Sequence, residues 1–319
     1  MSFSTRAAKH FGVMLALMAV VPLIEASAQG PLKLFPSPKR IQNQFRNTDA
    51  RIASGYYRLG VGNLREPATS DRAIEHLERA VGLDHTNAEY HYMLAEAYMA
   101  NYQIAGLTRM PFLASEVREH LELAVKYGPT VVEYREALVE YYAIAPAILG
   151  GSYQKAYEQA REIAKLDPYL GYLAQASIYV EEGEGEKALD AYRKAIRTRP
   201  AAWQAYQRLG THYLNELDTD QAIAMFMKYV EAAPDQAESY RHLGMAYQQK
   251  RMYSEAINAF RKALEKDPSI APLVFRIAQL HEFQGNKRDA CEHYQRYLSM
   301  VPSGKAADDA RVKVKELAR

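Results

Sequence analysis

The sequence predicts an all-α protein, a solenoid of about seven stacked helix pairs closed by one more helix at the C-terminus. Three observations lead to this fold class. The C-terminal half repeats with a period of 34 residues, small and aromatic residues recur at fixed positions of the period, and each period ends near a proline. A fixed period of about 20–50 residues is typical of repeat architectures, whose units stack to share one core.

The repeated residues explain how each helix pair would pack. A small residue lets two helices approach closely, and it recurs as Ala188, Ala222, Ala256 and Ala290. An aromatic residue follows four positions later and fills the space between units, as Tyr192, Phe226, Phe260 and Tyr294. A proline ends the second helix because it lacks an amide proton, and it recurs as Pro200, Pro234, Pro268 and Pro302.

This pattern resembles the tetratricopeptide repeat, a 34-residue unit of two antiparallel helices. The stretch YRHLGMAYQQKRMYSEAINAFRKALEKDP at 240–268 carries every element in order. The resemblance implies a right-handed α-solenoid in which the first helix of each unit lines a concave surface. It also implies a scaffold that holds proteins or peptides. The insertions resemble those of uncharacterised bacterial secreted repeat proteins, from which no activity follows.

The same pattern continues upstream with insertions. The segment EHLERAV at 75–81 returns as EHLELAV at 119–125, which is one period plus ten residues later. We predict units near 47–86, 87–130, 131–168, 169–202, 203–236, 237–270 and 271–304. Residues 305–319 are predicted to form the polar helix that caps a solenoid. Residues 29–46 contain three prolines, all of them before residue 40, and are predicted to be an extended lead-in.

The first 28 residues have the layout of a secretory signal peptide. Basic residues precede an apolar run of 14 residues from Phe11 to Ile24, and small residues lead to a predicted cleavage between Ala28 and Gln29. A membrane-spanning helix needs about 20 apolar residues, so the shorter run argues against an uncleaved anchor. We expect export to the periplasm or to the medium, with no integral membrane span after cleavage.

Composition and motifs argue against several classes of function. The chain has 40 basic and 38 acidic residues, whereas nucleic-acid binding needs clustered Lys and Arg. It has neither the HExxH spacing nor the cysteine pair of a metal site, and no GxSxG nucleophile motif. We therefore predict no nucleic-acid partner, no metal, no cofactor and no enzymatic activity.

Four residues that can carry chemistry receive a structural interpretation. Cys291 occupies a position where other units have a large aliphatic residue, and we expect a buried thiol. His281 replaces a repeated tyrosine and is expected in the core. His76 and His120 share one repeat position on a charged helix face and are expected to be solvated.

The concave surface is the predicted binding site. We expect its middle to be aromatic and aliphatic and to hold a peptide of a cell-envelope protein by apolar anchors. Counting from the repeat register gives the partner-binding residues Tyr92, Met99, Arg135, Val139, Tyr142, Leu173, Arg241 and Phe275. Two alternatives stay open: several of these side chains belong to the core between units, and the edge of the array mediates self-association.

The stretch IAPAILGGSYQKAY at 144–157 interrupts the repeat with an apolar run, a proline and two glycines. A phosphate-binding loop would need the spacing GxxxxGK[ST] after a strand. We instead predict an enlarged turn, in which Pro146 disfavours helix at Ala145. Gly150 and Gly151 would take backbone angles that other residues avoid, and the hydroxyl of Ser152 would cap the next helix.

The preceding unit has an apolar insertion at the same place, IAGLTRMPFLAS at 104–115. The two insertions either pack on each other or form a lip over one end of the groove, since insertions often gather on a binding face. The predicted lip residues are Ile104, Leu107, Phe112, Ile148 and Leu149. The alternative function is a secreted glycan-binding protein or enzyme with its site at 104–115 and 144–152.

Overall fold

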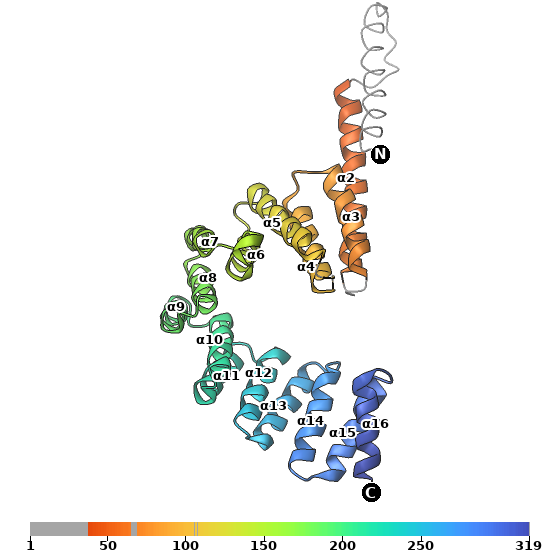
Figure 1. Cartoon of the computed structure of the whole chain (residues 1–319), viewed down its shortest axis with the longest axis vertical. Coiled ribbons are helices and arrows are strands. Elements are labelled where there is room, and N and C mark those ends of the chain that lie inside the picture. The colour runs from red at the N-terminus through yellow and green to blue at the C-terminus, as the bar shows by residue number, and fades with distance from the viewer. Residues whose placement is uncertain (1–37, 65–68, 105, 107, 319) are drawn as a thin grey trace, which may run out of the picture.

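A computed structural model describes residues 38–64, 69–104, 106 and 108–318 of the chain. These residues form α-helices that follow one another in an arc, with α2 at one end and α16 at the other (Figure 1). No strand occurs in these ranges, which confirms the predicted fold class. The predicted signal peptide, its cleavage site and Leu107 lie outside the described residues.

The helices form successive antiparallel pairs along the arc. The pairs are α2 (Pro38–Asn63) with α3 (Ser70–Leu83), α4 (Ala88–Ile104) with α5 (Met110–Tyr127), α6 (Val132–Ile144) with α7 (Tyr153–Leu166), α8 (Pro168–Glu181) with α9 (Gly185–Thr198), α10 (Trp203–Asn215) with α11 (Thr219–Ala232), α12 (Ala237–Gln249) with α13 (Tyr253–Lys266), and α14 (Ala271–Phe283) with α15 (Lys287–Met300). The single helix α16 (Lys305–Leu317) follows. Near the middle of the arc, α7 and α9 lie outside α6 and α8 (Figure 1).

Close packing inside each pair depends on the small residues that the repeat supplies. A Cβ atom on Gly210 would lie 2.6 Å from the ring of Phe226, and one on Gly244 would lie 2.5 Å from the ring of Phe260. Both rings are fully buried. Glycine therefore lets the first helix of the pair rest directly on the aromatic residue of the second.

The N-terminal end corrects one prediction. Residues 38–46, predicted to be extended, belong to the first turns of α2. Proline is compatible with the first turn of a helix, because the amide that it lacks would have no intrahelical partner there. The residues that follow, KRIQNQFRN, contain no glycine or proline, so nothing in the sequence stops the helix.

At the other end, α16 buries one side against the last pair and leaves the other to water. Its alanines Ala307 and Ala310 are fully buried, while most of its charged residues are exposed. The Lys313 ammonium donates to Glu282 of α14 at 2.8 Å. This arrangement is what covering the open end of a repeat stack requires.

The turn between α6 and α7 contains the predicted helix break and cap. Ala145 is extended, a short 3₁₀ helix η2 (Ala147–Leu149) follows Pro146, and Gly150 has a φ of 92°. A Cβ atom on Gly151 would lie 1.6 Å from the carbonyl oxygen of Ala145, so only glycine fits there. The Ser152 hydroxyl then accepts a hydrogen bond from the Lys155 amide at 3.3 Å.

The structure changes the interpretation of three of the four residues considered above. His281 is buried, as predicted. Cys291 is only half-buried, like Leu189 and Ile223 at the matching positions of other units. The prediction of solvated histidines is wrong: His76 stacks on the Tyr56 ring, and the His120 side chain is only 13% exposed.

Candidate functional site

A hollow of about 810 Å³ lies on the concave side of the arc. Its walls are the first helices of five successive pairs, α4, α6, α8, α10 and α12, with a contribution from α9. Such helices lie side by side because each pair stacks on the next in the same orientation. The cavity is large enough for a small ligand or several residues of a peptide.

Carboxylates dominate this cavity. Six glutamates line it, Glu96, Glu133, Glu136, Glu140, Glu181 and Glu238, against two arginines, Arg208 and Arg241. With the histidines neutral, the lining carries an excess of four negative charges. Three of the glutamates are at positions 133, 136 and 140 of α6, a spacing that puts them on one helix face. The groove thus combines aromatic and aliphatic residues of the predicted kind, such as Tyr92 and Val139, with an acidic set that was not predicted.

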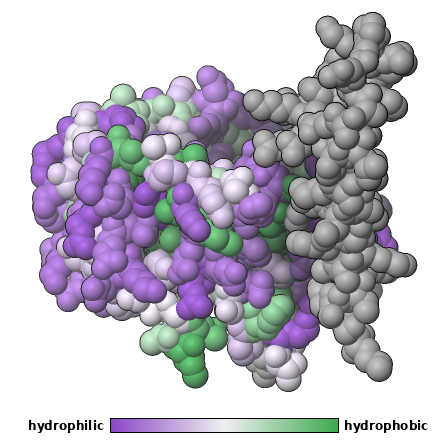
Figure 2. Space-filling model, turned by 90° about the horizontal axis from the view of Figure 1, so that it is seen from above, coloured by the Kyte–Doolittle hydropathy of each residue, from purple (hydrophilic) through white to green (hydrophobic). Residues whose placement is uncertain are grey.

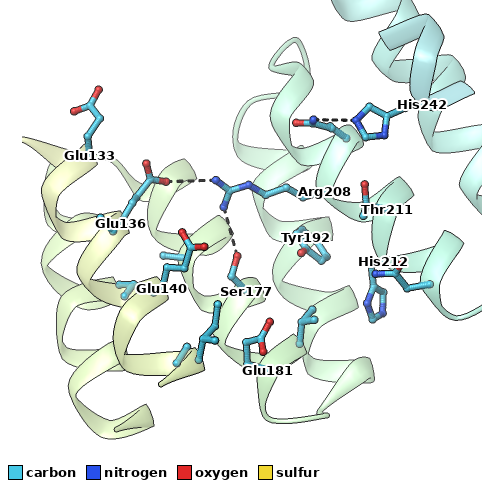
Figure 3. A pocket seen from close by; sticks show the side chains of 18 of the residues that line it. Glu133, Glu136, Glu140, Ser177, Glu181, Tyr192, Arg208, Thr211, His212 and His242 are labelled. Carbon is cyan, nitrogen blue, oxygen red and sulfur yellow. Dashed lines mark hydrogen bonds and ion pairs between the residues drawn. The ribbon is translucent and has the colours of Figure 1, made fainter. Parts of the chain in front are cut away.

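Both arginines already have partners within the protein. Arg208 of α10 reaches across the hollow toward α6, where its guanidinium lies 3.7 Å from Glu136 Oε1 (Figure 3). The same guanidinium donates to the Ser177 hydroxyl at 3.5 Å. Arg241 donates to Glu238 of its own helix at 2.6 Å. Neither arginine is left to neutralise the remaining carboxylates.

The carboxylates of the other four glutamates have no hydrogen-bond or ion-pair partner within the described part of the chain. They are Glu96, Glu133, Glu140 and Glu181. The Glu96 side chain reaches water, but the walls of the groove surround it. This partial burial, together with the charge of Glu140, raises the pKa of Glu96. Burial also raises the pKa of Glu136, although Arg208 opposes the rise. The groove would therefore gain stability from a cation.

A second cavity of about 440 Å³ adjoins the first. Glu96, Ala137, Glu140 and Ile144 line both, so the two spaces meet at these residues. The second cavity runs between α4, α5 and α6 and ends at the insertion after α6. Apart from the two glutamates and two tyrosines its walls are apolar: Ala95, Met99, Ala114, Val117, Leu121, Ala137, Ile144, Ala145, Pro146 and Leu149.

The predicted partner-binding residues divide between the cavities and the core. Tyr92, Val139 and Arg241 line the first cavity, and Met99 lines the second. The remaining four face elsewhere. Tyr142 and Leu173 are 4% and 0% exposed, and Phe275 packs edge-on against two tyrosine rings of α15. Arg135 donates to the carbonyl of Pro129 and to Gln159. These four side chains line neither cavity.

The predicted lip residues are also divided. Ile148 and Phe112 are 92% and 59% exposed, which is unusual for large apolar residues. Leu149 lines the second cavity. The side chains of Ile104 and Leu107 lie outside the described residues. The insertion after α6 thus contributes both an exposed edge and a cavity wall.

The described ranges contain no group of three or more His, Cys, Asp or Glu residues that could hold a metal ion. None of the helices within them is long and apolar enough to cross a membrane.

Comparisons with known proteins identify the repeat. Family models described as tetratricopeptide repeats match residues 173–237, 237–270 and 273–303. The structure of yeast Tom70 is 14% identical over 83% of this chain and 64% of that chain, with a TM-score of 0.54. The human IFIT1 dimer with PPP-AAAA is 19% identical over 79% of this chain and 60% of that chain, with a TM-score of 0.51.

The chain therefore spans less than two thirds of either of these structures, and both likenesses concern the fold. No curated protein matches the chain.

Proposed function

We propose that this chain, which is a tetratricopeptide repeat protein, is a non-enzymatic scaffold that binds a positively charged segment of a partner protein in its concave groove. The observation that carries the proposal is the set of glutamates on neighbouring first helices whose carboxylates have no partner. Tetratricopeptide repeats are interaction scaffolds, so a peptide is the ligand class that the fold favours.

The charge of the groove sets the chemistry of the partner. Lys and Arg side chains would pair with Glu96, Glu133, Glu140 and Glu181, whose carboxylates have no partner of their own. Acidic ligands and nucleic acids would be repelled, since their binding requires clustered positive charge. Opposite charges across an interface mainly raise the association rate and exclude wrong partners, so we expect the affinity to fall as salt rises.

The cellular setting of this proposal rests on the sequence of residues 1–28. A signal peptide cleaved between Ala28 and Gln29 would place the array in the periplasm or outside the cell, where its partner would be an envelope protein. Fusion of residues 1–28 to a reporter that is active only after export tests this part. An inactive reporter would contradict it.

Removing two of the unpaired charges tests the groove. We expect random dodecapeptides selected on the protein to be rich in Lys and Arg, and the variant Glu96→Gln/Glu140→Gln to bind them about tenfold more weakly. The matched control is Glu255→Gln/Glu265→Gln, which removes two exposed charges from α13. Selected peptides without net positive charge, or equal binding by both double variants, would contradict the proposal.

One observation favours the alternative of a glycan-binding protein or enzyme. Glu96 and Glu140 line the cavity beside residues 144–149. Partial burial and the charge of Glu140 raise the pKa of Glu96. A carboxylate with a raised pKa beside a second carboxylate in a cleft is an arrangement that acid–base catalysis can use. Binding or hydrolysis of glycans by the wild type, abolished in Glu96→Gln, would support this alternative. If the protein neither binds nor hydrolyses any glycan of a broad cell-wall panel, this alternative is excluded in favour of the peptide-binding scaffold.

A further inference from the structure

The second cavity has the features of a pocket for one bulky apolar side chain. It lies between α4, α5 and α6 and is bounded at one end by the insertion at 145–149. Five of its wall residues, Ala95, Ala114, Val117, Leu121 and Tyr141, are at most 6% exposed. The face seen from above in Figure 2 is mostly hydrophilic, with hydrophobic residues in small patches. An apolar recess of this size is uncommon on such a surface.

Hydrogen bonds attach the insertion to its neighbours. The Tyr141 hydroxyl lies 2.6 Å from the carbonyl oxygen of Leu149 and 2.9 Å from that of Ala114, and its proton can be donated to either. The Ser152 amide donates to the carbonyl of Tyr142 at 2.8 Å. These bonds tie the end of the insertion to α5 and α6. A cavity wall that is fixed by such bonds has less conformational freedom to lose when a side chain fills the cavity.

The entrance of the cavity carries charge of one sign. Glu96 and Glu140 lie where the second cavity meets the groove, and no cation of the described chain pairs with either. An occupant that buried only apolar atoms would desolvate these carboxylates further, at a cost. An occupant with a positive charge just outside the cavity would pair with them. The entrance thus selects an apolar side chain that is next to a cation.

We propose that this cavity, hereafter the anchor pocket, binds one bulky apolar side chain of the partner peptide while an adjacent Lys or Arg of that peptide pairs with Glu96 and Glu140. The inference deepens the proposed function and rests on it: the groove supplies general attraction to a basic segment, and the anchor pocket fixes its register. A single buried anchor commonly supplies a large part of the affinity of such an interface.

A substitution at Met99 tests the pocket without disturbing the core. Met99 lies on the cavity wall but is 37% exposed, so α4 should tolerate a polar residue there. Met99→Lys places a cation beside Glu96 and Glu140 and so competes with the cation of the peptide. Met227→Lys of α11 is the matched control, since Met227 is 48% exposed and lines neither cavity. A second variant, Ala114→Leu, fills the cavity from α5 and is paired with Ala259→Leu of α13, an equally buried alanine that lines neither cavity.

The probe is a random dodecapeptide library displayed on phage, followed by anisotropy with the enriched peptides. We expect an apolar residue next to Lys or Arg in the enriched sequences, and about tenfold or greater loss of affinity in Met99→Lys and Ala114→Leu but not in their controls. Replacing the apolar residue of the peptide by Ser should cause a similar loss in the wild type and little change in Ala114→Leu. Circular dichroism of each variant verifies the fold.

Failure of the pocket is distinguishable from failure of the groove. Basic peptides that bind with no apolar preference, equally well to wild type, Met99→Lys and Ala114→Leu, would overturn the anchor pocket and leave the acidic groove intact. Peptides that enrich without basic residues, or no enrichment at all, would overturn both.

Discussion

Protonation of one histidine pair is expected to loosen the second helix pair in mild acid. His91 of α4 and His120 of α5 face each other with their Nδ1 atoms 2.9 Å apart. His91 Nε2 lies 3.1 Å from the carbonyl oxygen of His85, which can only accept, so this nitrogen carries the proton. His91 Nδ1 must then accept from the protonated Nδ1 of His120. The free nitrogen of His120 is left 3.9 Å from Glu116.

The direction of the effect follows from the pKa values. Burial, and then the proximity of His91, lowers the pKa of His120 from 6.5 to about 4. Burial also lowers the pKa of His91, against the opposing charges of Glu119 and Asp84. The folded state therefore favours neutral rings, while the unfolded chain takes up protons as the pH falls below about 6.5. The stabilisation is complete above pH 6.5 and is lost progressively toward pH 4.

Below pH 6.5 the free energy of unfolding falls by about 1.4 kcal/mol for each pH unit and each histidine that stays neutral in the folded state. At pH 5.0 the contribution of His120 alone has fallen by about 2 kcal/mol. Because a repeat array unfolds locally, hydrogen exchange of α4 and α5, corrected for the intrinsic rate at each pH, is the appropriate measurement. We expect their protection to decrease between pH 7.5 and 5.0 by more than that of α8 and α9.

The variant His120→Asn isolates the pair. The asparagine amide can still donate to His91 but does not titrate. Between the two pH values the stability of the α4–α5 pair should therefore fall by about 2 kcal/mol less in this variant than in the wild type. The control is His85→Asn, which removes an exposed ring and keeps the backbone carbonyl. Parallel losses in the wild type and His120→Asn would refute the assignment of the proton positions and the pKa argument together.

Three further predictions concern the stability of the turn and of the pairs. Ser152→Ala should cost about 1 kcal/mol by removing the cap of α7, and Ser152→Asp should restore most of it in urea unfolding. Gly151→Ala should cost about 3 kcal/mol, because its Cβ would meet the carbonyl oxygen of Ala145. Gly244→Ala should cost about 1–3 kcal/mol by pressing on the Phe260 ring, seen as a lower melting temperature with unchanged helix content.

The repeat was predictable because its structural residues recur in the sequence itself. Ala222 and Ala256 are fully buried, and so are Phe226 and Phe260, as their spacing indicates. The start of α2 was not predictable from its prolines alone, since Pro38 is a barrier inside a helix but not at its first turn.

The groove was predicted on the correct helices, but its acidic side chains were not predicted. A helix turns by about 100° per residue. A register error of one residue therefore assigns to the groove side chains that point about 100° away from it. The sequence register put Arg135 and Tyr142 inward, whereas α6 presents Glu136 and Glu140. The spacing of these glutamates is visible in the sequence. Packing against the neighbouring helices decides which face of α6 points into the groove. The second cavity also depends on three helices meeting an insertion, which no local pattern encodes.

The groove draws its walls from five consecutive pairs, each of which touches mainly its neighbours. A stack of this kind is flexible along its length, because small rotations between successive pairs add up. A peptide that contacts α4, α6 and α8 would restrict the rotations between several pairs at once. Binding in the groove would then make the whole array stiffer, and the distance between its two ends would vary less.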